Sequence, residues 1–213
     1  MKSIRVLAFL CVIGGHMVHG ASDRVMDFMS YYNGDFNNEA QTKLPHDNHH
    51  LVKARFIPVD VECFRPNPVL YVEENINGAI VMTVLAVVTI GMQDTVSLSF
   101  YHLSDYRRDN PGELKVENLS NISCDVLQGD GSCVASYVVS NEGFVFGNFP
   151  LCDYTVCGSH PMFTSYHTCD SITAKLPQFQ QASPMEPYEF RLASKKYPLI
   201  NPPEGYKAPC RKY

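Results

Sequence analysis

The sequence predicts a mainly β protein, an antiparallel sandwich or barrel with one helix before its strands. Short segments rich in β-branched and aromatic residues recur along the chain, and turn signals separate them. The chain holds 12 Tyr and 12 Phe but no Trp, and aromatic residues favour strands and the walls of apolar pockets. Its 213 residues contain no internal repeat and no dividing linker, so we expect one domain.

Residues 1–20 have the three parts of a secretory signal peptide. Lys2 and Arg5 supply positive charge, residues 6–15 are apolar, and Gly20 is a small residue before the expected cut. The apolar run is too short to span a bilayer. We therefore expect residues 1–20 to be removed and residues 21–213 to be secreted as a single domain with a proline-rich C-terminal tail.

The charge of the chain argues against two classes of partner. It has 17 Lys and Arg against 22 Asp and Glu, a formal net charge of −5, whereas a nucleic-acid-binding surface needs a basic face. A polybasic membrane anchor is disfavoured for the same reason. The apolar stretch Ala79–Ile90 is shorter than the ~20 residues of a membrane span and predicts one or two buried strands.

An amphipathic helix is expected at the start of the mature chain. Ser22 and Asp23 can cap its first turn. Gly34 marks a break or the end of the helix, and a second short helix can begin within residues 37–41. The apolar residues at helical spacing are Val25, Phe28, Met29, Tyr32 and Phe36.

The rest of the chain predicts short strands joined by turns. Asn77-Gly78 favours a tight turn between two strands. Pro58 lacks a backbone donor, so it places the second half of its strand at an edge or a bend. Val96, Leu98 and Phe100 alternate with polar residues and share one face. The expected strands are residues 51–61, 69–72, 79–90, 95–101, 133–139, 144–146, 162–168 and 187–192.

Seven cysteines remain once Cys11 leaves with the signal peptide. Thiols pair in an oxidising compartment, so three disulfides use six of them and one is left for a second chain, a buried slot or a ligand. The seven are Cys63, Cys124, Cys133, Cys152, Cys157, Cys169 and Cys210.

The pairing of these cysteines is open, because several connectivities are possible. Cys124–Cys133 is the most natural hairpin bridge, and Cys152–Cys157 or Cys152–Cys169 follow. A structural disulfide is the stronger interpretation of Cys63. If one thiol is unpaired, however, we expect it to be Cys63, where it could bond to a ligand or to a partner chain.

Five segments of the chain, in order, form a set that resembles a known family. Tyr31–Gln41 is similar to its amino-terminal signature, His49–Val59 to its first barrel strand, and Leu70–Asn75 to its glutamate-bearing strand. Val96–Tyr106 and Cys124-Asp125 are similar to two later elements. The family is that of the CpcT/CpeT-type bilin lyases, the chromophore lyases of phycobiliprotein assembly.

The resemblance implies a calyx-like, lipocalin-like antiparallel β-barrel with an N-terminal helix and a cavity for open-chain tetrapyrroles. In the family a basic segment follows the glutamate strand, whereas Asn75–Val81 carries no positive charge here. A Trp-Gly element of the family is also absent, because this chain has no Trp. We therefore expect a secreted relative that binds a linear tetrapyrrole (bilin) or a similar ligand without lyase activity.

Three residues are candidate ligand contacts. Tyr71 and Glu73 lie two apart on one strand and share a face. If this face lines the cavity, Glu73 can bind pyrrole N–H groups or act as an acid or base. Arg55, on the first strand, can neutralise a propionate. The alternative places Tyr71 and Glu73 outside as a solvated pair, and Glu74 is expected to face the other way and to be solvated.

Two groups of residues have the chemistry of metal ligands, but we expect no metal. Their spacing is irregular, and export favours disulfides over thiolate ligands. The first group is His46, Asp47, His49 and His50, and the second is Cys157, His160, His167 and Cys169.

Asn118 and Asn121 each begin an Asn-x-Ser tripeptide. In a secreted eukaryotic protein, at least one would carry a glycan.

Three functions fit these observations. The first is a secreted barrel that binds an apolar small molecule, with a linear tetrapyrrole as the possible ligand. The second is an extracellular structural or matrix glycoprotein without a ligand, in which the odd cysteine links two chains. The third and weakest is an active chromophore lyase. The interior discriminates between the first two, because a binder needs apolar inward residues with one or two polar anchors.

Overall fold

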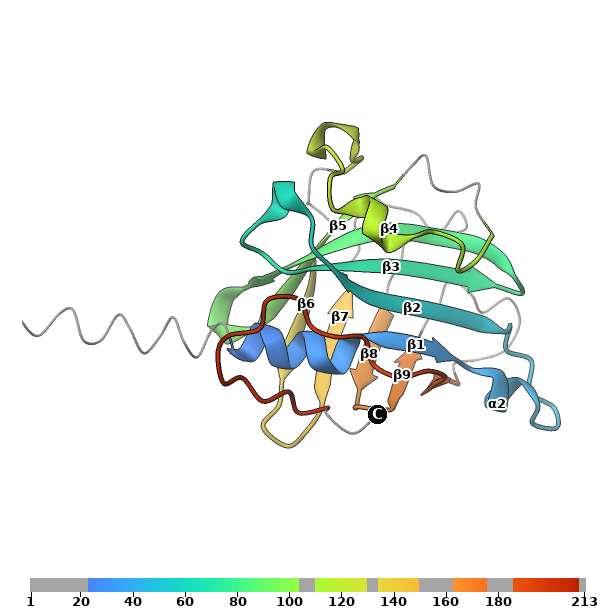
Figure 1. The fold of residues 1–213 in the computed structure, drawn as a ribbon. Helices are drawn as coiled ribbons and strands as arrows, with labels where there is room; N and C mark the ends of the chain where they lie inside the picture. The colour runs from blue at the N-terminus through green and yellow to red at the C-terminus, as the bar shows by residue number, and fades with distance from the viewer. Residues whose placement is uncertain (1–22, 104–109, 130–133, 150–162, 176–185, 211–213) are drawn as a thin grey trace, which may run out of the picture.

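The computed structural model describes residues 23–103, 110–129, 134–149, 163–175 and 186–210. Ten strands among these residues close into an antiparallel barrel (Figure 1). Each strand from β2 to β10 pairs with its neighbour in sequence, and β1 pairs with β10 to complete the ring. The expected mainly β, calyx-like barrel with an N-terminal helix is therefore confirmed.

The strands are of unequal length, and the longest form one side of the barrel. Their bounds are β1 Gly34–Asn37, β2 Val52–Val59, β3 Val69–Ile76, β4 Ala79–Ile90, β5 Val96–His102, β6 Val134–Val139, β7 Val145–Phe149, β8 Phe163–His167, β9 Ser171–Lys175 and β10 Tyr188–Leu192. A short helix, α2 (Glu39–Thr42), lies between β1 and β2.

The helix of residues 23–32 closes one end of the barrel. Its Tyr32 ring packs edge-on against Phe56 of β2 and against Tyr137 of β6, both of which face the interior. Phe28, one turn earlier, also contacts Tyr137. We call this the helix end of the barrel. None of the described helices is long and apolar enough to cross a membrane.

The C-terminal tail covers this helix. In Figure 1 it runs alongside the helix as the dark red segment. The Tyr206 hydroxyl donates a 2.7 Å hydrogen bond to Asp27, and the backbone N–H of Cys210 donates a 3.2 Å bond to the Ser30 hydroxyl. Cys210 is also disulfide-bonded to Cys169 in the β8–β9 turn. The helix is thus held between the barrel and the tail.

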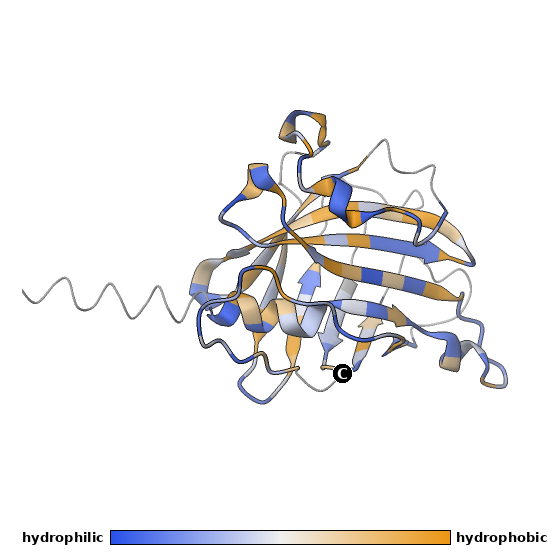
Figure 2. Ribbon diagram, in the orientation of Figure 1, coloured by the Kyte–Doolittle hydropathy of each residue, from blue (hydrophilic) through white to orange (hydrophobic). Residues whose placement is uncertain are grey.

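Side chains alternate between the interior of the barrel and its outer wall, and apolar and polar residues alternate along the first half of β2 in Figure 2. Because the side-chain period of a strand is two, residues paired across neighbouring strands lie on the same side. The inner apolar core includes Ala54, Phe56, Leu70, Val72, Val84, Ala86, Val88, Val96, Leu98, Ala135, Tyr137, Val145, Ile172, Ala174 and Phe190.

A second apolar layer lies outside the wall formed by β2, β3 and β4. The segment after β5, which includes the short helical turns Val116–Leu119 and Cys124–Val126, packs there. Its Leu114 and Leu119 are buried against Tyr71 and Leu85. This part of the barrel wall is therefore covered on both faces.

The Cys63–Cys124 disulfide fastens the outer segment to the chain that follows β2. The two Cα atoms lie 6.0 Å apart although the cysteines are 61 residues apart in sequence. The predicted Cys124–Cys133 bridge is therefore wrong, and Cys63 is not the unpaired cysteine. Packing of the outer layer brings Cys63 and Cys124 together although they are distant in sequence.

The second disulfide also corrects a prediction. Cys169 bonds to Cys210, with Cα atoms 5.2 Å apart, so Cys169 cannot pair with Cys152. Two disulfides fit an extracellular protein. The predicted signal peptide, Ser22, His160 and the cysteines at positions 133, 152 and 157 lie outside the described residues.

Most predicted elements are present, with two differences. Asn77 and Gly78 form the β3–β4 turn with positive φ angles of 50° and 87°, as a tight hairpin turn requires. Gly34, with φ 125°, ends the helical segment, so Phe36 lies on β1 and not on the helix. Strand β9 was not expected from the sequence, because Ser171–Lys175 holds only two apolar residues facing the core.

Candidate functional site

The three predicted contact residues come together, but on the outer wall of the barrel. Arg55 and Glu73 are paired across β2 and β3, and Tyr71 precedes Glu73 by two residues on the same face. Tyr71 belongs to the outer apolar layer. Their face is therefore neither the interior nor a solvated surface, since the segment after β5 covers it.

Glu73 is fully engaged within the protein. Its carboxylate accepts a 2.8 Å hydrogen bond from the Tyr71 hydroxyl and a 2.9 Å bond from the backbone N–H of Gly112. Arg55 Nη1 lies 3.7 Å from the same carboxylate and Arg55 Nε lies 3.5 Å from Asp35. Glu73 is 1% exposed, so a ligand would have to displace these contacts to reach it. The arrangement fastens the outer segment to the wall.

The barrel interior holds a different polar set, contributed mainly by strands that the sequence analysis did not connect. Cross-strand pairing with core residues places each of these side chains inside: Glu74 pairs with Ala54 and Met82, and His102 pairs with Val84. The inward-facing polar side chains of the described strands and helix include Tyr32, Glu74, His102, Tyr137, Ser165, His167 and Tyr188.

A hydrogen-bonded chain crosses the helix end of the interior. The Tyr32 and Tyr137 hydroxyls lie 3.0 Å apart, and His167 Nε2 lies 2.9 Å from the Ser165 hydroxyl. Ser165 also hydrogen-bonds Tyr137, which joins the two pairs. The Tyr32 ring stacks on the His167 ring with centroids 4.3 Å apart. The four side chains form one buried network.

Burial sets the protonation states of this network. It raises the pKa of Tyr137 to about 12 and raises that of Tyr32 well above its usual value. Burial lowers the pKa of His167 to about 3, so its imidazole is neutral at pH 7. Nδ1 of His167 has no hydrogen-bond partner among the described residues.

Glu74 lies nearer the opposite end, beside the Asn77–Gly78 turn, which we call the turn end. Burial alone raises the pKa of its carboxyl to about 7. Unlike Glu73, it makes no hydrogen bond or ion pair with the described residues. A register shift between Glu74 and Asn75 places a β-bulge directly after it, and bulges are common beside functional sites, where they re-aim a side chain.

Along β3, β4 and β5, exposure of inward-facing side chains increases from the helix end to the turn end. Along β4, Val88, Ala86 and Val84 are fully buried, whereas Met82 is half-buried. The same change occurs on β3, where Leu70 is fully buried and Ile76 half-buried. The interior is therefore partly exposed on the β3–β5 side of the turn end, where half-buried inner residues cluster: Glu74, Ile76, Met82, Phe100 and His102.

Chemically, this end combines apolar walls with an acid that is about half ionised near pH 7. Glu74 can accept a hydrogen bond, pair with a cation or exchange a proton. The expectation that Glu74 is solvated is wrong. The hydrophobic pattern of β3 does not indicate that Glu74 faces the interior, because both faces of the strand are buried. The inward direction is assigned by the cross-strand partners of Glu74, which are Ala54 and Met82.

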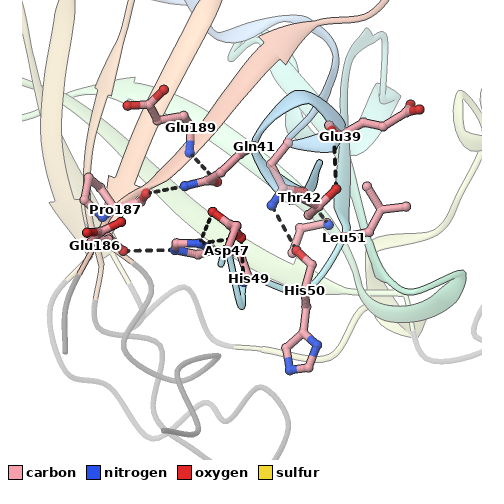
Figure 3. Close-up of polar contacts among 12 residues, drawn as sticks. Glu39, Gln41, Thr42, Asp47, His49, His50, Leu51, Glu186, Pro187 and Glu189 are labelled. Carbon is pink, nitrogen blue, oxygen red and sulfur yellow. Dashed lines mark hydrogen bonds and ion pairs between the residues drawn. The ribbon is translucent and has the colours of Figure 1, made fainter. Parts of the chain in front are cut away.

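Two members of the first possible metal group, Asp47 and His49, instead belong to a polar cluster that joins the α2 region to the start of β10 (Figure 3). His49 uses both ring nitrogens: Nδ1 lies 3.1 Å from Asp47, and Nε2 lies 3.2 Å from the Glu186 carbonyl oxygen. Nearby, the Gln41 amide donates to the Pro187 carbonyl and accepts from the N–H of Glu189.

The second group is not assembled either, because the sulfur of Cys169 is in a disulfide and His167 faces the interior. No group of three potential metal ligands occurs among the residues that the structure describes. Asn118 and Asn121 are both exposed, on the outer segment.

Comparison of this chain with models of known protein families, and with curated protein sequences, finds no match.

Proposed function

We propose that this protein is secreted and binds a linear tetrapyrrole or a similar apolar small molecule at the turn end of its barrel, without lyase activity. The observation that carries the proposal is the carboxyl of Glu74, which has no partner among the described residues and lies among half-buried apolar side chains. Small-molecule sites are typically apolar with a few polar groups that orient the ligand. The two disulfides support export.

The absence of lyase activity is proposed from the residues around Glu74. Residues 75–81, which follow it, contain no Lys or Arg to hold a propionate. Lys53 and Arg55 flank Ala54, the β2 partner of Glu74, but both face outward, and Arg55 is engaged with Glu73 and Asp35. Transfer of a chromophore needs the ligand held firmly at both its charged and its reacting ends.

An absorbance titration of residues 21–213 with biliverdin tests the proposal. We expect a saturable shift of the long-wavelength band, weakened in Glu74→Gln and unchanged in Glu189→Gln, an exposed glutamate on the outer face of β10. Colour should be lost on a denaturing gel, since no covalent bond is expected. Absence of any spectral change at tens of micromolar would contradict bilin binding.

A second function, an extracellular structural glycoprotein without a ligand, is favoured by the filling of the helix end. There the barrel is occupied by its own rings, because the Tyr32 ring contacts those of Phe28, Phe56 and Tyr137. The exposed Asn118 and Asn121 are available for glycans. A disulfide-linked dimer on a non-reducing gel of the secreted protein, together with no response to biliverdin, would support this second function.

A further inference from the structure

The charges inside the barrel are unbalanced. Glu74 is the single carboxylate that faces inward from the described strands, and these strands direct no Lys or Arg inward. On β2, both Lys53 and Arg55 face outward. Lys196, which follows β10, lies at the helix end, where its ammonium donates to the Tyr31 carbonyl and sits over the Phe36 ring.

The immediate neighbours of Glu74 cannot satisfy its carboxylate. The cross-strand partners are Ala54 and Met82, and the residues two positions away on β3 are Val72 and Ile76. None of these side chains donates a hydrogen bond. An ionised carboxylate in such surroundings is unfavourable unless a donor or a cation reaches it.

The other titratable groups that face this interior from the described strands and helix are tyrosines and histidines, and they include Tyr188 of β10, which pairs with Ala174. Tyr32 and Tyr137 are neutral and hydrogen-bonded to each other. His167 is neutral at pH 7 at the helix end. His102 faces the interior from β5, with β4 between it and Glu74. Burial is the cause of the raised Glu74 pKa, and no charged group of the described residues contributes to it.

We infer that the turn end selects apolar ligands that bring a protonated amine or another N–H donor to Glu74, and that it rejects ligands with a buried carboxylate. The inference rests on the proposed function and narrows its ligand class. The recognised chemistry is a cationic or N–H-bearing head on an apolar body. Any acidic group of the ligand stays outside the barrel.

A matched series of ligands that differ in one head group tests this selectivity. Dodecylamine, dodecanol and dodecanoate have the same chain and are titrated calorimetrically at pH 7.5, below their aggregation concentrations. We expect the amine to bind at least 10-fold more tightly than the alcohol and the carboxylate to bind most weakly. In Glu74→Gln the amine should lose this advantage, while in Glu189→Gln the order should be unchanged.

The outcomes separate the inference from the proposed function. Equal or tighter binding of dodecanoate would overturn the selectivity and leave ligand binding intact. An amine preference that survives in Glu74→Gln would also overturn it, since another group would then be responsible. If none of the three binds, the inference fails, and the biliverdin titration then decides whether the barrel binds a ligand at all. Circular dichroism of both variants establishes that each is folded.

Discussion

Glu73 and Glu74 are consecutive residues of β3, yet their carboxyl groups lie on opposite sides of the barrel wall. Glu73 faces the outer layer and accepts hydrogen bonds from Tyr71 and Gly112. Glu74 faces the interior without a partner among the described residues. Two identical side chains thus serve different purposes, one holding a covering segment and the other presenting an acid to the interior.

Glu74→Gln should change how stability depends on pH. The folded-state pKa of about 7 lies above the ordinary 4.5, so the folded protein keeps a proton that the unfolded chain loses. The free energy of unfolding therefore falls as pH rises from about 4.5 to about 7, by roughly 3 kcal/mol in total. Urea denaturation at pH 5 and pH 8 should show this fall in the native protein and not in the variant.

Comparing the pH dependence of stability in the native protein and in Glu74→Gln isolates the contribution of Glu74. Burial lowers the pKa of Lys196 to about 7, but Lys196 is present in both proteins, so its contribution cancels in the comparison. Glu189→Gln, which changes an exposed glutamate, should keep the native pH dependence. If the free energy of unfolding of Glu74→Gln fell with pH as it does in the native protein, the Glu74 carboxyl would not be the cause of that fall.

Glu73→Gln should loosen the outer segment. The carboxylate accepts hydrogen bonds from Tyr71 and Gly112 and lies near Arg55. An amide has one acceptor oxygen, and its NH2 group cannot accept the second of these hydrogen bonds. We expect a loss of about 2–3 kcal/mol in the free energy of unfolding. Amide hydrogen exchange should become faster in residues 110–119 and remain slow in β7. Equal exchange in both regions would refute the anchoring role.

Removal of the Cys169–Cys210 disulfide should release the tail from the helix. The bridge closes a loop with a sequence separation of 41, for which loop entropy predicts a loss of about 3–4 kcal/mol. In the double variant Cys169→Ala/Cys210→Ala, exchange should accelerate in residues 23–32. The matched variant Cys63→Ala/Cys124→Ala should instead affect residues 113–127. The opposite assignment would contradict the described packing.

Gly147→Ala should overfill the interior. Gly147 lies on β7 opposite Tyr137, and a Cβ atom there would be 2.6 Å from Cγ of that ring. Overpacking of this kind costs about 1–3 kcal/mol, measurable by thermal or urea denaturation. Asn148→Ala, at the exposed neighbouring position, should cost much less. If Gly147→Ala were as mild, the Tyr137 ring would have to have room to move.

The strand pattern could be predicted because most strands bury one face. On β5, Val96, Leu98 and Phe100 alternate with polar residues and all face the core, as expected. The Asn77–Gly78 turn has strong local chemistry. By contrast, β9 is short and half polar, so its place in the sheet depends on pairing with β8 and β10.

The inward or outward direction of β3 could not be predicted for a physical reason. The outer face of β3 is covered, so four consecutive residues are buried: Val69, Leu70, Tyr71 and Val72. Apolar and polar residues therefore do not alternate in the part of the strand that precedes Glu73 and Glu74. The disulfides were equally inaccessible, because separations of 61 and 41 residues reflect tertiary packing. The glutamate pair could therefore be found in the sequence, but which glutamate faces the interior could be assigned only from the structure.

The seam between β1 and β10 has a consequence for how the protein is made. Phe36 pairs with Leu192, and the backbone N–H of Cys210 donates to Ser30, so the ring cannot close until the chain has been synthesised beyond β10. Contacts of such long range form slowly, and the unfinished sheet exposes apolar surface meanwhile. Folding is therefore expected to complete only after β10 and Cys210 have left the ribosome, and truncation before β10 should yield an aggregating product and not a smaller barrel.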